Sequence, residues 1–236
     1  MLVVDNFIDE SEINQTIKKI FQLKSDWNIR TNHFVEIPFY SLGAAVYLDV
    51  FENDLENYSQ LYKRKNPILN ENFSDLHQKI YQCLKGIYNC DFIHYEKSAL
   101  PGFHIFLTDD VFEIPIASRH CDLQYLKIDW CDLTVDPSKA LSFTLYLKLP
   151  ANGGGVYYWD RFHEELANYD AIKREQILHD STRHLKTFSE GDLFIHNGHQ
   201  FHQIAPFFDI QENDQRISLQ GHAIYSPTIN KYLVHW

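Results

Sequence analysis

Apolar residues recur at helical spacing in two segments of the first third of the chain. In residues 9–24, four of them share one face of a helix: Ile13, Ile17, Ile20 and Phe21. Asp9 or Ser11 is suited to cap its start. Residues 74–88 repeat the pattern, with Ser74 as the candidate cap. We expect both segments to be scaffold helices.

From about residue 92 the pattern changes to short β-rich runs, with Gly, Pro, Asn and Asp between most of them. The runs are 103–107, 120–128, 141–149, 155–159, 191–196, 201–206 and 216–225. Such a series is typical of a sandwich, barrel or jelly roll. Residues 162–180 interrupt it with a charged, helix-prone stretch. We expect a surface insert there, which either covers the mouth of a pocket or only decorates the surface.

Length and composition indicate one domain. The chain has 236 residues, 44% of them hydrophobic and 15% aromatic, which is enough for one packed core. We expect a single domain over 1–236. Its helical N-terminal support spans about 1–90, a β core follows over about 92–228, and the core carries the 162–180 insert.

Charge and cysteine content narrow the possible partners. The net charge is −11, and the nearest basic run, Lys63-Arg64-Lys65, is three residues long, so nucleic acid is disfavoured as a partner. Four cysteines without a Cys-x-x-Cys pair predict neither a disulfide framework nor a zinc finger. Neither a signal peptide nor a membrane span is indicated, and we expect a cytoplasmic protein.

The first chemical candidate is His120-Cys121-Asp122. On a strand, residues i and i+2 point to the same face, so His120 and Asp122 would offer a nitrogen and an oxygen to one ion. Two histidines and one carboxylate form the facial triad of non-haem iron(II) oxygenases. A lone His-x-Asp is more often a hydrogen-bonded surface pair, so the interpretation depends on the rest of the chain.

The second candidate lies between residues 191 and 219. His196, His199 and His202 fall on either side of a turn near Asn197-Gly198, and all three compete as the distal ligand. Arg216 opens the last predicted strand, where its guanidinium could pair with a carboxylate through two hydrogen bonds. Ser218 shares its face and could donate a further hydrogen bond.

Together these residues resemble the 2-oxoglutarate/iron(II)-dependent dioxygenase superfamily. Its pattern is His-x-Asp, a distant His, and an Arg on a late strand, and the likeness covers about residues 95–225. Residues 3–9 and the helix after them also resemble the start of prolyl-hydroxylase-like members. The resemblance implies a mainly β fold with flanking helices around a double-stranded β-helix, the jelly-roll or cupin-like core.

The resemblance also implies a role for several residues. It favours His202 as the distal ligand, because His-x-x-x-Pro before the Arg is frequent in the family; His199 is the main alternative. With His120, Asp122 and His202 on iron, Arg216 and Ser218 would bind 2-oxoglutarate. Tyr146 matches the family's cosubstrate tyrosine, although it also fits a core aromatic, and Thr144 shares its face.

The implied activity is an Fe(II)-dependent oxygenase that uses 2-oxoglutarate and O2 and releases succinate and CO2. Related halogenases replace the carboxylate ligand with a small residue, so Asp122 disfavours halogenation. We expect hydroxylation of a small molecule, such as an amino acid or a natural-product intermediate. The alternatives are a hydroxylase of protein side chains, a non-oxidative cupin-like metal enzyme, and a binding protein with a degenerate site.

Three further residues are candidates for contacts with the substrate or with the ligands: Gln124, His222 and Trp159. Gln124 shares the strand face of Asp122, and His222 shares that of Arg216. Trp159, with Phe103 and Tyr158, suggests an aromatic wall, although each is as well placed for the core.

Overall fold

The computed structural model describes residues 1–30, 37–50, 55–115 and 117–236. Parts of the expected N-terminal support, residues 31–36 and 51–54, therefore lie outside the described residues. The helices are α1 (Glu10–Gln22), α2 (Val46–Asp49), α3 (Glu56–Tyr88), α4 (His163–Leu166) and α5 (Ala171–Asp180), with 3-10 turns η1 (Lys24–Asp26), η2 (Asp110–Glu113) and η3 (Gln124–Lys127). The strands are β1 (Leu2–Val4), β2 (Asn28–Ile29), β3 (Phe39–Leu42), β4 (Phe92–His94), β5 (Gly102–Phe106), β6 (Asp136–Lys148), β7 (Val156–Phe162), β8 (Arg183–Lys186), β9 (Leu193–Asn197), β10 (Gln200–Ile204), β11 (Arg216–Ser226) and β12 (Lys231–His235).

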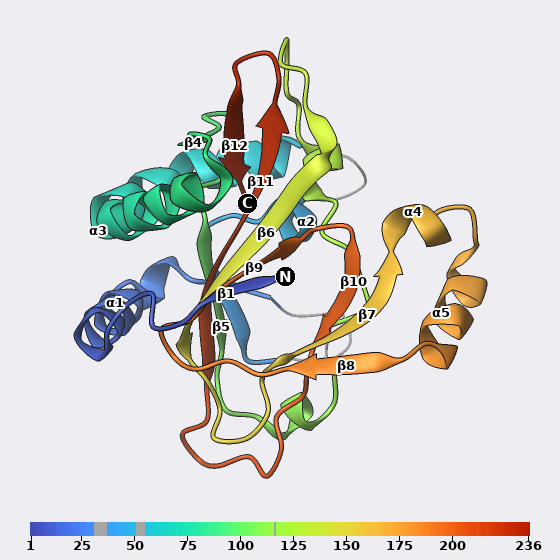
Figure 1. Cartoon of the computed structure of the whole chain (residues 1–236). Helices are drawn as coiled ribbons and strands as arrows, with labels where there is room; N and C mark the ends of the chain where they lie inside the picture. The colour runs from blue at the N-terminus through green and yellow to red at the C-terminus, as the bar shows by residue number, and fades with distance from the viewer. Residues whose placement is uncertain (31–36, 51–54, 116) are drawn as a thin grey trace.

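These strands form a large and a small sheet (Figure 1). The large sheet runs β1-β9-β6-β11-β5-β3-β2, with β12 antiparallel to β11 and parallel to β4. The small sheet runs β10-β7-β8, and all its pairs are antiparallel. A cavity lies between the sheets, lined by residues of both. The predicted mainly β jelly roll with flanking helices is confirmed.

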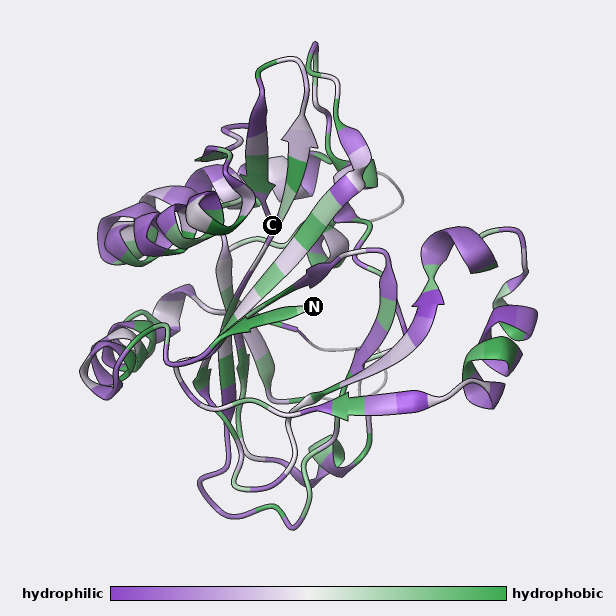
Figure 2. Cartoon of the chain, in the orientation of Figure 1, coloured by the Kyte–Doolittle hydropathy of each residue, from purple (hydrophilic) through white to green (hydrophobic). Residues whose placement is uncertain are grey.

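Alternation along the strands separates the core from the cavity. On β11, Ile217 and Leu219 join the main hydrophobic core, whereas Arg216 and Ser218 face the other way. On β5, Phe103 is a core residue for the same reason. Residues of α1 and α3 cover this apolar face, among them Ile13, Ile20, Leu69, Phe73, Ile80 and Leu84. Hydrophobic positions accordingly concentrate on the central strands, while the solvent sides of the helices are hydrophilic (Figure 2).

The first predicted helix is confirmed and the second is longer than predicted. Asp9 caps α1 in a capping box with Glu12. The prediction of a helix starting at Ser74 is wrong, because α3 begins at Glu56 and runs through Pro67. Its first half packs through tyrosines set among Asn, Lys and Gln, a composition in which the apolar stripe is easily missed.

The predicted strand over 120–128 is also wrong beyond its first residues. His120 forms an isolated antiparallel bridge with His202, and the chain then enters the 3-10 turn η3. The side chain of Gln124 turns back to donate to Asp122 Oδ1 at 3.1 Å. The N-terminal segment, in turn, contributes β1, β2 and β3 to the large sheet, which its helical pattern did not predict.

The insert lies between β7 and β8, where α4 and α5 project from the small sheet (Figure 1). Leu166 and Leu178 of the insert pack on Trp159 and Phe201, which point to the outer face of that sheet. Among the described residues, no helix has the length and apolarity needed to cross a membrane.

Candidate metal centre and cosubstrate cavity

Three side chains meet where the two sheets face each other. The possible ligand atoms of His120, Asp122 and His202 all lie within 4.8 Å of one another. Their backbones fix this arrangement. His120 and His202 exchange two backbone hydrogen bonds of 3.0 and 2.9 Å, and the Asp122 N–H donates to the Gly198 carbonyl at 2.6 Å. The structure therefore brings together the three residues predicted as ligands.

The hydrogen bonds of both imidazoles leave the same nitrogen free. Nδ1 of His120 donates to the Ser118 carbonyl at 2.8 Å, and Nδ1 of His202 donates to the Gln200 carbonyl at 2.9 Å. Since a carbonyl can only accept, each neutral ring carries its lone pair on Nε2. The two Nε2 atoms lie 3.7 and 3.5 Å from carboxylate oxygens of Asp122. Burial lowers the pKa of both histidines, which favours the neutral, ligating form.

Asp122 is buried, with 8% of its surface exposed. Burial alone would raise the pKa of its carboxyl, but the surrounding imidazoles hold that pKa well below its usual range. From the residues that the structure describes, the carboxylate accepts one side-chain hydrogen bond, that of Gln124. A buried carboxylate with so few donors around it suits a bound cation.

A cavity of about 630 Å³ extends from this cluster along the inner face of the large sheet. Its polar lining comes from alternate positions of three neighbouring strands. These residues are Ser142, Thr144 and Tyr146 on β6, His196 on β9, and Arg216, Gln220 and His222 on β11. Tyr47 and His104 line it as well, and the Tyr47 hydroxyl lies 2.8 Å from His104 Nε2.

Arg216 lies in this wall as a buried cation, with 1% of its surface exposed. Its Nε donates to the Gly154 carbonyl at 3.3 Å, and Nη1 reaches Ser218 Oγ at 3.5 Å. The guanidinium lies over the rings of Phe106 and Tyr146, 5.6 and 5.4 Å from their centres. Within the described part of the chain, no carboxylate forms an ion pair with Arg216. A desolvated charge without a counter-ion marks a site for an anion.

The other predicted residues fall on both sides of the cavity wall. Gln124 and His222 line it, as expected. Trp159 does not, and this prediction is wrong. It lies on the outer face of the small sheet under the insert, because the neighbouring positions of β7, 156 and 158, take the inner face. Phe103 is likewise a core residue, and Tyr158 stacks on His184.

His199 lies outside the cluster. Its Nδ1 contacts the Glu164 carboxylate, and its Nε2 lies 3.0 Å from the Tyr125 hydroxyl. Beside it, the Sγ of Cys121 donates to the His199 carbonyl at 3.1 Å, so this thiol points away from the carboxylate of Asp122. Both ring nitrogens of His199 are therefore engaged elsewhere.

Several wall residues escaped the sequence analysis, chiefly Tyr47, His104 and Ser142. Tyr47 and His104 lie far from the His-x-Asp segment in the chain, and only the pairing of β3 and β5 with β11 brings that wall together. Ser142 could have been noticed, since it precedes Thr144 and Tyr146 at the same alternate spacing.

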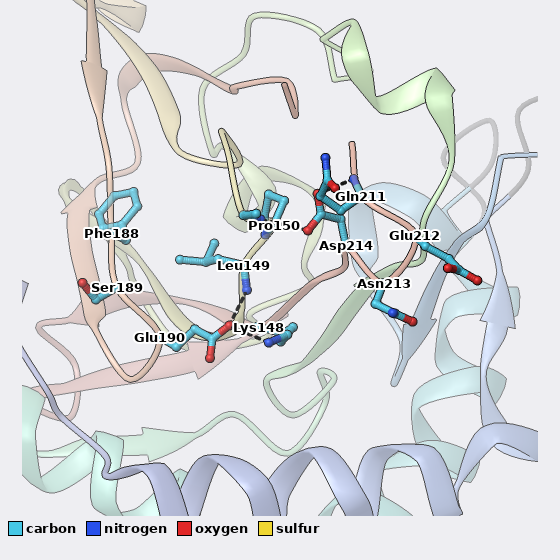
Figure 3. Close-up of a pocket in the computed structure, with 11 residues that line it drawn as sticks. Lys148, Leu149, Pro150, Phe188, Ser189, Glu190, Gln211, Glu212, Asn213 and Asp214 are labelled. Atoms are coloured by element: carbon cyan, nitrogen blue, oxygen red, sulfur yellow. Dashed lines mark hydrogen bonds and ion pairs between the residues drawn. The ribbon is translucent and has the colours of Figure 1, made fainter. Parts of the chain in front are cut away.

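A second hollow of about 760 Å³ opens at the end of β6, between residues 148–151, 188–190 and 211–214 (Figure 3). Among the described residues that line it, Lys148 is the one cation, and it is paired with a carboxylate of the same hollow. Lys148 Nζ lies 3.2 Å from Glu190 Oε1, which also accepts a hydrogen bond from the Leu149 N–H. The Asp214 carboxylate accepts hydrogen bonds from the backbone N–H groups of Ala151 and Gln211. It lacks the histidines and the unpaired cation that distinguish the first cavity.

Comparison with known proteins gives no match to a family model or to a curated sequence. Solved structures do match. An N-substituted L-amino acid dioxygenase from Burkholderia ambifaria superposes with a TM-score of 0.60 and 13% identity, covering 99% of this chain and 85% of that one. The chain has the fold of the 2-oxoglutarate-dependent oxygenases.

Other members with this fold match over similar lengths. The 2-oxoglutarate-dependent epimerase SnoN of nogalamycin biosynthesis gives a TM-score of 0.56 at 11% identity, covering 94% of this chain and 80% of that one. HygX from Streptomyces hygroscopicus was solved with nickel, 2-oxoglutarate and hygromycin B. It gives a TM-score of 0.51 at 13% identity, covering 94% of this chain and 81% of that one. At such identities the likeness establishes the oxygenase fold, and the chemistry has to be argued from this chain's own side chains.

Proposed function

We propose that the chain is an Fe(II)- and 2-oxoglutarate-dependent oxygenase with His120, Asp122 and His202 as metal ligands. The observation that carries the proposal is the pairing of two unsatisfied groups along one cavity. The Nε2 lone pairs of two histidines and the Asp122 carboxylate form a cation-binding site at one end of the cavity. The buried guanidinium of Arg216, in the cavity wall, forms an anion-binding site. A dicarboxylate with a metal-chelating 2-oxo group supplies both partners.

The donor set fits iron(II). Two neutral imidazoles and a carboxylate on one side of the ion leave positions open on the other side, as in the 2-His-1-carboxylate sites of non-haem oxygenases. The carbonyl acceptors on both Nδ1 atoms fix the ring orientations and raise the basicity of Nε2. A zinc site of the cupin type would not require a buried arginine in the same cavity.

Each remaining residue has a role that follows from its place. Arg216 would bind the distal carboxylate of 2-oxoglutarate in a charge-assisted pair, with the Ser218 hydroxyl beside it. Tyr146 would form the floor under that guanidinium. Gln124 would orient the Asp122 carboxylate through its 3.1 Å hydrogen bond. Iron(II), 2-oxoglutarate and O2 together supply the oxidation of a substrate C–H bond, with release of succinate and CO2.

The substrate that we propose is a small molecule, held in the remainder of the cavity. The lining there includes neutral hydrogen-bonding groups and aromatic rings, namely Tyr47, His104, Gln220 and Phe39. Arg30 also lines it, but its charge is paired with Asp49. Proteins with this fold bind hygromycin B or nogalamycin compounds, or act on N-substituted L-amino acids. Hydroxylation is our first choice of outcome. A carbocyclase and an epimerase share the fold, and a protein side chain is the alternative substrate.

Anaerobic titration tests this function without knowledge of the substrate. Protein loaded with Fe(II) under argon should develop a weak visible charge-transfer band when 2-oxoglutarate is added, because the 2-oxo acid chelates the ion. In air, slow succinate release should follow. Asp122→Ala should lose the band, whereas Trp159→Phe, outside the cavity, should keep it. A wild-type protein with neither the band nor succinate would contradict the proposal.

A further inference from the structure

Asp122 lies among four imidazoles, two more than the predicted ligand set needs. Its Oδ2 is 3.6 Å from His196 Nε2 and 3.9 Å from His222 Nδ1. The corresponding distances to the predicted ligands His202 and His120 are 3.5 and 3.7 Å. His196 is therefore as close to the carboxylate as the two histidines assigned to the ion.

The protonation pattern of His196 matches that of the two ligands. Its Nδ1 donates to the Asn197 carbonyl at 3.1 Å, so the lone pair of the neutral ring is on Nε2, facing the Asp122 carboxylate. A separation of 3.6 Å is too long for a hydrogen bond. Two groups that bind one ion at about 2.1 Å each lie about 3–4 Å apart. A shared cation accounts for a lone pair facing a carboxylate at this distance.

His222 differs in this respect. Its Nδ1 is engaged by the Ser142 hydroxyl at 2.9 Å, and its Nε2 is not the atom nearest to Asp122. The same nitrogen would have to leave Ser142 to bind an ion. Of the two additional imidazoles, only His196 presents a free lone pair to the carboxylate.

The sheet holds His196 in this place. His196 and Ser142 are direct partners across β9 and β6, and Ser142 and His222 are partners across β6 and β11. The His196 ring stacks on the Phe194 ring, with 4.9 Å between their centroids. It packs edge-on against the His202 ring, with 4.7 Å between their centroids. Only 6% of His196 is exposed. A ring fixed on two sides loses little further freedom when it binds an ion.

We propose that His196 is a third histidine of the metal centre, binding the ion through Nε2 while 2-oxoglutarate is absent. The inference rests on the proposed function for the presence of the ion. Three imidazoles and one carboxylate leave too few open positions for both a chelating cosubstrate and O2 on a six-coordinate ion. His196 therefore gives up its position when 2-oxoglutarate binds, while His120, Asp122 and His202 remain.

Counting coordinated imidazoles tests this directly. The purified metal-free protein is loaded with one equivalent of Cu(II), and pulsed electron paramagnetic resonance gives the number of bound histidines. We expect three in the wild-type protein and two after His196→Gln. The matched control is His199→Gln, three residues further along the chain, which should retain three because the His199 ring nitrogens face Glu164 and Tyr125. X-ray absorption of the Co(II) protein repeats the count with an ion less selective for nitrogen.

Metal affinity alone would not be decisive. Loss of a residue that merely orients a ligand also weakens binding by about 10–100-fold. The nitrogen count separates the two roles, since an orienting residue leaves it unchanged. Addition of 2-oxoglutarate should lower the wild-type count from three to two and leave the His196→Gln count at two.

The possible outcomes distinguish a failure of the proposed role of His196 from a failure of the proposed oxygenase function. Two histidines in the wild-type protein, with either ion, overturn the role of His196. If the charge-transfer band still forms in that case, the oxygenase proposal stands. A protein that binds no ion overturns both. The wild-type count decides even if His196→Gln fails to fold.

Discussion

Arg216 combines a cost to stability with a gain in binding. A guanidinium removed from water without a counter-ion destabilises the folded protein, and the partial compensation here comes from a carbonyl, a hydroxyl and two aromatic rings. The cost is recovered when an anion binds. Stability and cosubstrate affinity should therefore respond in opposite directions to the loss of this charge.

Replacing Arg216 by methionine should raise the free energy of unfolding of the ligand-free protein by about 1 kcal/mol or more, because an apolar chain fills the buried site without a desolvation cost. The same change should abolish binding of 2-oxoglutarate. Arg216→Lys should bind the cosubstrate weakly, since it keeps the charge but loses the two-pronged geometry. Urea unfolding and anaerobic titration measure the two effects. A methionine variant that is less stable than the wild type would contradict this account of Arg216.

At the residue scale, local spacing predicted His120, Asp122 and Arg216, and the family resemblance selected His202 among three histidines. The fold does bring all four into one cavity. The position of His196 beside the carboxylate could not be predicted in this way. It depends on the register between β9 and β6, which pairs His196 with Ser142. Sequence spacing within one strand carries no information on which residue of another strand lies opposite.

At the scale of elements, α3 shows how a helix can lie against the sheet with polar as well as apolar groups. His77, 2% exposed, lies 2.9 Å through Nε2 from the Pro101 carbonyl just before β5 and stacks on Tyr81. Burial lowers the pKa of His77 from 6.5 to about 4. Between these values the unfolded chain binds a proton that the folded protein does not, so stability falls as the pH is lowered.

From the two pKa values, the contribution of His77 to the free energy of unfolding should fall by about 2 kcal/mol between pH 7 and pH 5. His77→Gln can keep a hydrogen bond to Pro101 without titrating, so its loss of stability over this range should be smaller by that amount. His179→Gln, at an exposed position of α5, is the control and should follow the wild type. Urea unfolding at the two pH values measures the difference, and equal losses in wild type and His77→Gln would refute it.

Element boundaries were predicted best where one face is apolar and the ends are capped. Asp9 begins α1 as expected, and the alternating strands of the core lie close to their predicted ranges. The strand expected over 120–128 ends early because the chain enters the 3-10 turn η3 at Gln124.

At the scale of the molecule, the proposed site is divided between two sheets. His202 belongs to β10 of the small sheet, whereas Arg216, Ser218 and Tyr146 belong to the large one. Backbone hydrogen bonds between the His120 segment and β10 fix the metal end, and β11 fixes the guanidinium. The proposed cosubstrate would therefore contact both sheets, and the packing between them sets the distance that it has to span.

The chain should consequently discriminate between 2-oxo dicarboxylates by length. Oxaloacetate, one carbon shorter, and 2-oxoadipate, one carbon longer, should each bind at least about tenfold more weakly than 2-oxoglutarate, a loss of about 1.4 kcal/mol. Competition for the charge-transfer band measures this. Arg216→Met, which should not bind the cosubstrate, is the negative control for the band. Equal affinities of the three acids for the wild-type protein would be inconsistent with a fixed spacing between the two sheets.

Cys121 lies between two proposed metal ligands, so its reactivity affects how resistant the enzyme is to oxidative inactivation. Iron and O2 in one site generate oxidants, and thiols react with them mainly as thiolates. Burial raises the pKa of Cys121 well above its ordinary value, and its Sγ is directed to the His199 carbonyl instead of the Asp122 carboxylate. This neighbour of the proposed metal ligands is thus held as a protonated thiol, the form that oxidants attack most slowly.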